Sequence, residues 1–144
     1  MMLHAVRTEL TCRRLMTVPG VGALTAVTYF TTIDDPARFE HSRDVGAHLG
    51  LTPRKYASGE IDRNGAISKC GDALLRTTLH QAALALLTRT QRWSAIKAWG
   101  VAVAKRRGLK RAVVAVARKL AVVMHRIWAD GSTFRWSRKE ESVA

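Results

Sequence analysis

The segment KRAVVAVARKLAVVMHRIWA, residues 110–129, decides the fold class of this chain. Its apolar residues recur at helical spacing, and a helix turns about 100° per residue, so Arg111, Arg118 and Arg126 fall on one basic stripe. This pattern is typical of a core-facing helix with a basic outer face. Two further helical segments precede it, over Asp72 to Thr88 and over Arg92 to Arg107, and we predict a mainly α, compact helical domain.

The N-terminal third of the chain predicts shorter helices. We expect them over His4 to Met16, over Ala23 to Thr32, and over Arg43 to Leu49, where Ser42 is a candidate N-cap and Gly50 closes the helix. Residues 53–65 are rich in turn formers and predict a loop or a small β-hairpin. We expect one domain over residues 1–131, followed by a flexible tail over 132–144.

Charge is the strongest compositional signal. The 144 residues include 24 Lys and Arg against 11 Asp and Glu, a net charge of +13. Residues 73–129 contain no Asp or Glu, although ordinary solvated helices mix the two signs to form ion pairs. This distribution predicts a polyanionic partner, and the alternative is a basic surface that serves solubility alone. Helical spacing favours a core or interface position for Trp93, Trp99 and Trp128 over stacking on bases.

Several classes of protein are disfavoured by the sequence. The N-terminus shows no secretory signal, and the uncharged or apolar stretches over residues 15–33 and 112–129 are interrupted by Pro-Gly or by basic residues, so we expect no membrane span. Two cysteines, Cys12 and Cys70, predict reduced thiols in the cytoplasm. The five histidines are scattered, and we predict no metal site built from this chain alone.

The first motif with functional chemistry is TVPGVGALTA, residues 17–26, set between two expected helices. A turn of the form Gly-hydrophobic-Gly is typical of a helix-hairpin-helix. In such a motif Gly20 and Gly22 allow a close backbone approach, and the amides that open the second helix can hold a DNA phosphate. It would bind the DNA backbone without reading sequence. The alternative is a simple Pro-Gly break between two helices.

The second motif is LTPRKYASG, residues 51–59, followed by ISKCGD, residues 67–72. Ser58 precedes a glycine and lies close in sequence to four cations, and a serine that attacks a phosphodiester needs cations to stabilise the negative transition state. Those cations are Arg54, Lys55, Arg63 and Lys69. The alternative is an ordinary turn serine.

Taken together, residues 15–131 resemble the C-terminal transposase domain of the insertion-sequence-110 family, of the Piv/MooV type. The phrases MTVPGVGALTA, RFEHSRDVGAHLGLTPRKYASGE, NGAISKCGDALLR and KRAVVAVARKLAVVMHRIWADG occur in the order and spacing of that family. The resemblance implies a recombinase that cuts and rejoins DNA through a covalent phosphoserine and is guided by a structured RNA. It carries over Ser58 as the nucleophile, Gly20 and Gly22 as the phosphate-binding hairpin, and Lys69 and Arg76 as basic residues of the site.

The chain also departs from the family pattern. Ala57 stands where a second serine is common, and Cys70 stands where a basic residue is common. The family's N-terminal RuvC-like domain, with its four acidic metal ligands, has no counterpart in these residues, and the local acidic run over residues 34–44 does not replace it. We therefore expect the chain alone to bind nucleic acid without recombining DNA, and any Mg²⁺ to be held by the RuvC-like domain.

The expected partners are DNA, a guide RNA, and either further copies of this chain or a RuvC-like domain, in a bacterial cytoplasm and associated with the nucleoid. Two other hypotheses stay open. One is a non-catalytic helix-hairpin-helix accessory protein that binds the DNA or RNA of the element. The other is an inactive transposase remnant.

Overall fold

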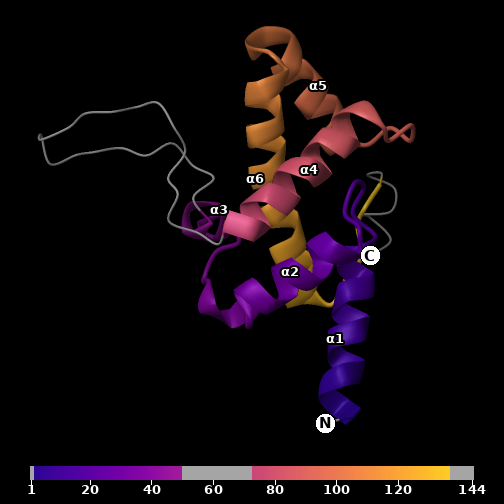
Figure 1. Ribbon diagram of the computed structural model, residues 1–144, viewed down its shortest axis with the longest axis vertical. Coiled ribbons are helices and arrows are strands. Elements are labelled where there is room, and N and C mark those ends of the chain that lie inside the picture. Colours follow the sequence, from indigo (N-terminus) through magenta and orange to yellow (C-terminus); the bar gives the residue numbers. More distant parts are fainter. Residues whose placement is uncertain (1, 50–72, 137–144) are drawn as a thin grey trace, which may run out of the picture.

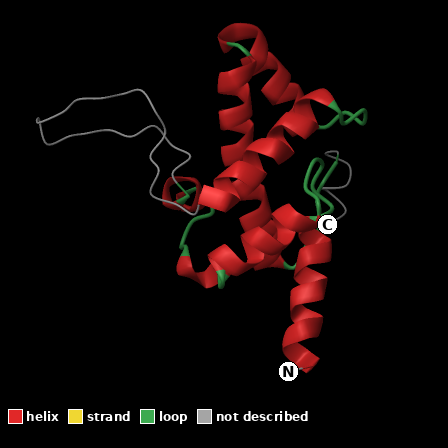
Figure 2. Cartoon of the chain, in the orientation of Figure 1, coloured by secondary structure: helices red, strands yellow, loops and turns green. Residues whose placement is uncertain are grey.

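The computed structural model describes residues 2–49 and 73–136. Within these ranges every regular element is a helix, as Figure 2 shows. The mainly α fold expected from the sequence is therefore confirmed. The helices are α1 (Met2–Leu15), α2 (Ala23–Ile33), the 3-10 turn η1 (Pro36–Arg38), α3 (Asp44–His48), α4 (Ala73–Thr88), α5 (Ala95–Arg107) and α6 (Leu109–Asp130).

Helix α6 is the central element of the domain. It packs against α1, α3, α4, α5 and η1, and it runs along the long axis of the molecule from the α5 corner to the region of α2 (Figure 1). Its buried residues form rows spaced four residues apart, such as Ala112, Val116, Leu120 and Met124, the spacing of one helical face. Val116, Leu120 and Met124 have no exposed surface at the centre of the core. The segment that predicts the fold class is thus the one around which the other helices assemble.

A buried hydrogen bond joins the N-terminal helices to α6. The hydroxyl of Tyr29 on α2 donates to the backbone carbonyl of Ala121 at 2.7 Å, and the Tyr29 side chain has no exposed surface. Beside it, Phe30 stacks on Trp128 with ring centroids 4.9 Å apart. A buried hydroxyl needs such a partner, so this bond fixes the position of α2 along α6.

A single glycine separates α5 from α6. Gly108 has φ +92° and acts as the C-cap of α5 and the N-cap of α6. Only glycine adopts this backbone conformation without strain, and it lets the chain reverse between two long helices with no longer loop. The resulting corner forms one end of the molecule (Figure 1).

Helix α5 begins later than expected because a serine side chain caps it. The helix predicted from Arg92 begins at Ala95, because Ser94 accepts a hydrogen bond from the backbone N–H of Lys97 and so marks the N-cap.

The expected capping by Ser42 is wrong. Helix α3 has Arg43 at its N-cap position with no side-chain hydrogen bond, whereas the Ser42 hydroxyl lies 2.7 Å from Nδ1 of His125 on α6. The other ring nitrogen, Nε2, lies 2.8 Å from the carbonyl oxygen of Pro36, which can only accept, so Nε2 carries the proton and Nδ1 accepts from Ser42. A tertiary partner has displaced the local cap.

The C-terminal segment after α6 contacts the helical body over its described part. The backbone N–H of Phe134 donates to the hydroxyl of Thr17 at 2.9 Å, and the guanidinium of Arg92 lies 4.0 Å above the ring of Trp136. The expectation of a flexible tail over 132–144 otherwise falls on residues 137–144, outside the described residues. The same holds for the expected hairpin over 53–65. None of the helices in 2–49 and 73–136 combines the length and apolarity needed to cross a membrane.

Candidate nucleic-acid interface

The sequence-predicted site residues divide into two groups. Gly20, Gly22 and Arg76 lie on described elements. The candidate nucleophile and the four cations near it in sequence lie outside the described residues: Ser58, Arg54, Lys55, Arg63 and Lys69. The interface is therefore built here from the glycine turn, from α4 and from the basic surface of α5 and α6.

Gly20 is constrained by packing against α4. Its φ is +86°, and a β-carbon added there would lie 2.4 Å from the carbonyl oxygen of Ala82 and 3.2 Å from the backbone nitrogen of Leu86. Real β-carbons do not approach backbone that closely, so only glycine fits at this position. The first glycine of the motif thus seats the turn between α1 and α2 on α4, with Val18 and Val21 buried beside it.

Gly22 has the opposite surroundings. Its φ is −99°, it forms the N-cap of α2, and a β-carbon added there would meet nothing within 4 Å. No side chain caps the helix and no acid stands in its first turn, and the first helical bond runs from the N–H of Ala26 to the carbonyl of Gly22. The amides that precede Ala26 can therefore donate to an anion from outside, as the helix dipole favours.

Arg76 lies one turn into α4 and is half-buried. Its nearest titratable neighbour along the helix is His80, one turn further on. Burial lowers the pKa of His80, and the charge of Arg76 lowers it further. The imidazole of His80 is thus biased toward its neutral form. The positive charge on this face of α4 therefore comes from Arg76.

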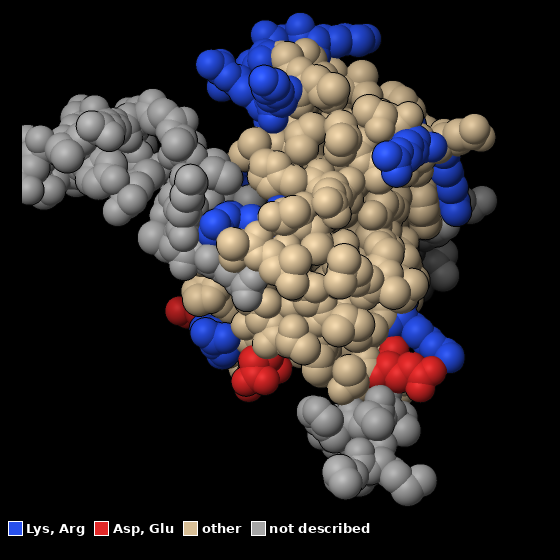
Figure 3. All heavy atoms as spheres, in the orientation of Figure 1, with Lys and Arg blue, Asp and Glu red and all other residues tan. Residues whose placement is uncertain are grey.

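Among the described residues, a dense group of exposed cations lies at the α5–α6 corner. Figure 3 shows a group of Lys and Arg atoms at that end of the molecule, while the Asp and Glu atoms visible on the same face lie toward the other end. Five cations at the α5–α6 corner are exposed, and we call them the corner cluster: Lys105, Arg106, Arg107, Lys110 and Arg111.

Helix stability explains three of the five cations of the corner cluster. Cations in the last turn of α5 interact favourably with the negative end of that helix. Lys110 and Arg111, however, stand in the first turn of α6, where the positive end of the dipole disfavours them and where acids are the usual choice. With no acid anywhere in residues 73–129 to offset them, a polyanion is the partner that such a cluster suits.

The basic stripe on α6 is partly used in packing. The alkyl chain of Arg118 lies over Gly46 of α3, whose added β-carbon would stand 2.8 Å from Cγ of Arg118. A β-carbon at position 46 would have to displace the side chain of Arg118, which is exposed at the surface.

A metal site does not fit the acids of the described part. In residues 2–49 and 73–136 no three His, Cys, Asp or Glu side chains come together in a way that could hold an ion. Asp35 is used locally, since its carboxylate accepts the N–H of Ala37 at 2.9 Å and caps η1. We accordingly assign no step of any reaction to a metal on these residues.

Sequence reasoning missed two features that depend on the tertiary fold. One is the contact between Ser42 and His125, which are 83 residues apart. The other is a groove between α5, α6 and residues 132–135, to which Trp99 and Lys119 contribute side chains from two helices. The absence of Asp and Glu from residues 73–129 is the sequence signal for a basic surface, but it does not show which cations lie close together in the fold.

Comparison with known proteins places the chain among transposases. The family model described as Transposase IS116/IS110/IS902 family matches residues 12–99. The transposase for insertion sequence element IS1111A of Coxiella burnetii is 38% identical over 125 residues, which is 86% of this chain and 34% of that protein.

Two further relatives agree with this match. The transposase for insertion sequence element IS1328 of Yersinia enterocolitica is 34% identical over 86% of this chain and 37% of its own length. The pilin gene-inverting protein of Moraxella lacunata is 25% identical over 83% of this chain and 37% of its own length. The chain thus spans about a third of the length of the curated relatives that it matches.

Proposed function

Because this chain belongs to the IS116/IS110/IS902 transposase family, we propose that it is a nucleic-acid-binding part of a transposase that carries the serine nucleophile for cutting and rejoining DNA. The observation that carries the binding function is the corner cluster, five exposed cations within residues 105–111 in a stretch that contains no acid. Binding through phosphates supplies affinity for both DNA and RNA without sequence readout.

Two surfaces of the helical body would share this binding. The amides at the start of α2, exposed beside Gly22, would hold one phosphate, and the corner cluster would hold several. Arg76 on α4 would add a cation, and DNA and a guide RNA are the proposed ligands. Further copies of this chain or a RuvC-like domain are the proposed protein partners. Association with the nucleoid follows from DNA binding.

The proposed reaction is a transesterification at Ser58. The serine hydroxyl oxygen attacks the phosphorus of a DNA phosphodiester, an oxygen–phosphorus bond to the serine forms, and the bond to one deoxyribose oxygen breaks. The serine proton passes to a base or to water, and the departing deoxyribose oxygen gains a proton. Attack by the hydroxyl of another strand reverses these steps and releases the serine. The cations Arg54, Lys55, Arg63 and Lys69 would stabilise the negative charge that develops.

The nucleophile is tested with Ser58→Ala in this chain, supplied with a RuvC-like domain and with the DNA and RNA of its element. We expect strand exchange and the covalent protein–DNA adduct to fall below about a thousandth of wild type, while binding is unchanged. Ser68→Ala is the control and should retain both. Undiminished exchange by Ser58→Ala would refute the nucleophile, and binding with no adduct in the wild-type protein would favour the non-catalytic accessory role.

The binding surface is tested separately on the 144-residue chain. Changing Arg106, Arg107 and Lys110 to Gln removes three charges from the corner cluster, and changing Arg13, Arg38 and Arg43 to Gln removes three from the N-terminal region. For the corner variant we expect at least about tenfold weaker binding to a DNA duplex. The slope of log affinity against log salt should fall by about 0.9 for each phosphate that is no longer neutralised. Equally weakened binding in both variants would show that only net charge matters.

A further inference from the structure

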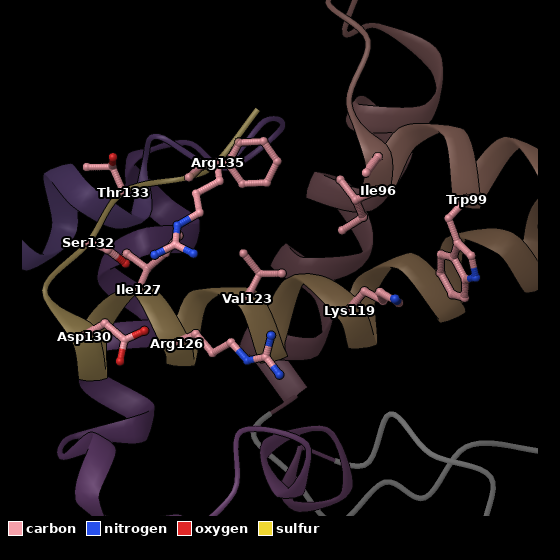
Figure 4. Close-up of a pocket in the computed structure, with 12 residues that line it drawn as sticks. Ile96, Trp99, Lys119, Val123, Arg126, Ile127, Asp130, Ser132, Thr133 and Arg135 are labelled. Atoms are coloured by element: carbon pink, nitrogen blue, oxygen red, sulfur yellow. The ribbon is translucent and has the colours of Figure 1, made fainter. Parts of the chain in front are cut away.

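A groove opens between α5, α6 and the segment that follows α6. Its walls are the first turn and a half of α5, the second half of α6 and residues 132–135, and it encloses about 370 Å³ (Figure 4). This volume lies in the range of about 300–1,000 Å³ that is typical of small-ligand sites. Ile96, Val123 and Ile127 form an apolar floor, and the first and last of these are buried.

The rim of the groove is basic. Lys119 and Arg126 stand two turns apart on α6, and Arg135 approaches from the segment that follows α6, as Figure 4 shows. All three are exposed, and Asp130 is the one acid among the lining residues. An apolar floor surrounded by three cations suits a ligand that has a flat apolar part and an anionic part.

One aromatic ring in the groove is already associated with a cation. The indole of Trp99 is half-buried, and Nζ of Lys119 lies 4.7 Å from the ring centroid. The ammonium is thereby held at the groove against the ring, and a planar base that stacks on Trp99 would displace it toward a flanking phosphate. Alternation of aromatic faces with cations is the arrangement by which proteins bind unpaired nucleotides.

We propose that this groove binds one or two unpaired nucleotides of a single-stranded nucleic acid. A base lies on the apolar floor against Trp99, and the flanking phosphates contact Lys119, Arg126 and Arg135. A duplex does not fit, because its bases are stacked and paired and cannot enter the groove. The groove shares no residue with the corner cluster or with the Ser58 motif, and it requires no chemistry at either.

The test uses the 144-residue chain and fluorescently labelled 12-nucleotide strands of deoxythymidine or of uridine. The chain itself offers a matched control, since Trp93 is 60% exposed and also has a lysine over its ring, Lys97 at 5.6 Å, but does not line the groove. We expect Trp99→Ala to weaken binding of the single strands about fivefold or more, and Trp93→Ala to weaken it less than twofold.

A second set of variants guards against loss of folding in Trp99→Ala. Trp99→Phe keeps an aromatic face and should retain most of the wild-type affinity. Arg135→Gln should weaken binding and reduce the slope of log affinity against log salt by about 0.7. Strands that carry 5-iodouracil should crosslink to the peptide that contains Trp99 on irradiation. Affinity for a duplex of equal length should be the same in Trp99→Ala as in the wild type.

Three results would overturn the proposal. They are equally weakened binding in Trp99→Ala and Trp93→Ala, no crosslink to the Trp99 peptide, and displacement of the strand by polyglutamate as readily as by unlabelled strand. The last result would mean that the groove responds to negative charge alone and would fit an acidic peptide. The two strands distinguish the source of the nucleotides, since selective binding of uridine indicates RNA and equal binding indicates either nucleic acid.

Discussion

The two described regions of the chain differ in charge and yet share one core. Residues 2–49 carry five Arg against five Asp and Glu, whereas residues 73–136 carry thirteen Lys and Arg against one Asp. The first region is thus neutral overall and the second has a net charge of +12. Such a contrast could suggest two separate units, one balanced in charge and one basic.

Packing rules out that interpretation. The Gly20 turn rests on the backbone of α4, Tyr29 is bonded to α6, and His125 of α6 is bonded to Ser42 and to the carbonyl of Pro36. Each of these contacts crosses from one region to the other. Charge is therefore divided over the surface of helices that share one hydrophobic core, and the neutral region helps to hold the helices that present the cations.

The largest effect is expected where the glycine turn meets α4. Gly20→Ala introduces a β-carbon 2.4 Å from a backbone oxygen at a φ of +86°, so the turn and α4 must separate. We expect a loss of about 2–4 kcal/mol in the free energy of unfolding, measured by urea denaturation, with both regions unfolding together.

Gly22→Ala is the matched control two residues away. Its φ is −99° and no atom lies near the new methyl group, so its stability should change by less than about 1 kcal/mol. If the two variants were equally stable, Gly20 would not be the contact that joins the regions.

The second effect concerns His125, which is 4% exposed and joins α6 to the segment before α3. His125→Ala removes two hydrogen bonds and leaves a cavity, and we expect a loss of about 2–3 kcal/mol by the same measurement. His41→Ala, at an exposed position, should change stability by less than about 0.5 kcal/mol. Similar values for both histidines would contradict the proposed role of this contact.

The third effect is smaller and depends on pH. Tyr29→Phe removes one buried hydrogen bond and should cost about 1 kcal/mol at neutral pH. Burial raises the pKa of Tyr29, so the folded protein holds this proton more tightly than the unfolded chain does. Its contribution is present below about pH 10 and is lost as pH rises above that value. The alkaline loss of stability should therefore be shallower in Tyr29→Phe, and identical slopes would contradict the assignment.

The smallest expected effect is on the titration of His80, a partly buried histidine in the basic region. Burial and the charge of Arg76 lower the pKa of His80, so its NMR titration midpoint should lie below about 6.5. Its contribution to stability is present above that pH and diminishes as pH falls. Arg76→Gln should raise the midpoint without restoring it, because burial remains. A midpoint that falls in this variant would show that Arg76 does not act on His80 through its charge.

Local sequence signals were sufficient to predict the helical class and most helix positions. The apolar spacing of residues 110–129, the Pro-Gly break after α1 and the glycine at 108 each act through backbone geometry or a single helical face. Composition alone likewise showed that positive charge dominates the second half of the chain. The family phrases predict the transposase family, and the match over residues 12–99 agrees with them.

Which residues meet depends on the packing of the whole domain. Ser42 looked like a local cap because capping is the nearest use for a serine before a helix, but a buried histidine 83 residues away offers a partner that must itself be satisfied. Gly20 and Gly22 look alike in the motif, and only the approach of α4 makes one a packing residue and leaves the other open. The pairing of Trp99 with Lys119 likewise requires α5 and α6 to lie side by side. Periodicity fixes the face of a helix on which a side chain lies, but the neighbour of that face is set by how the whole core packs.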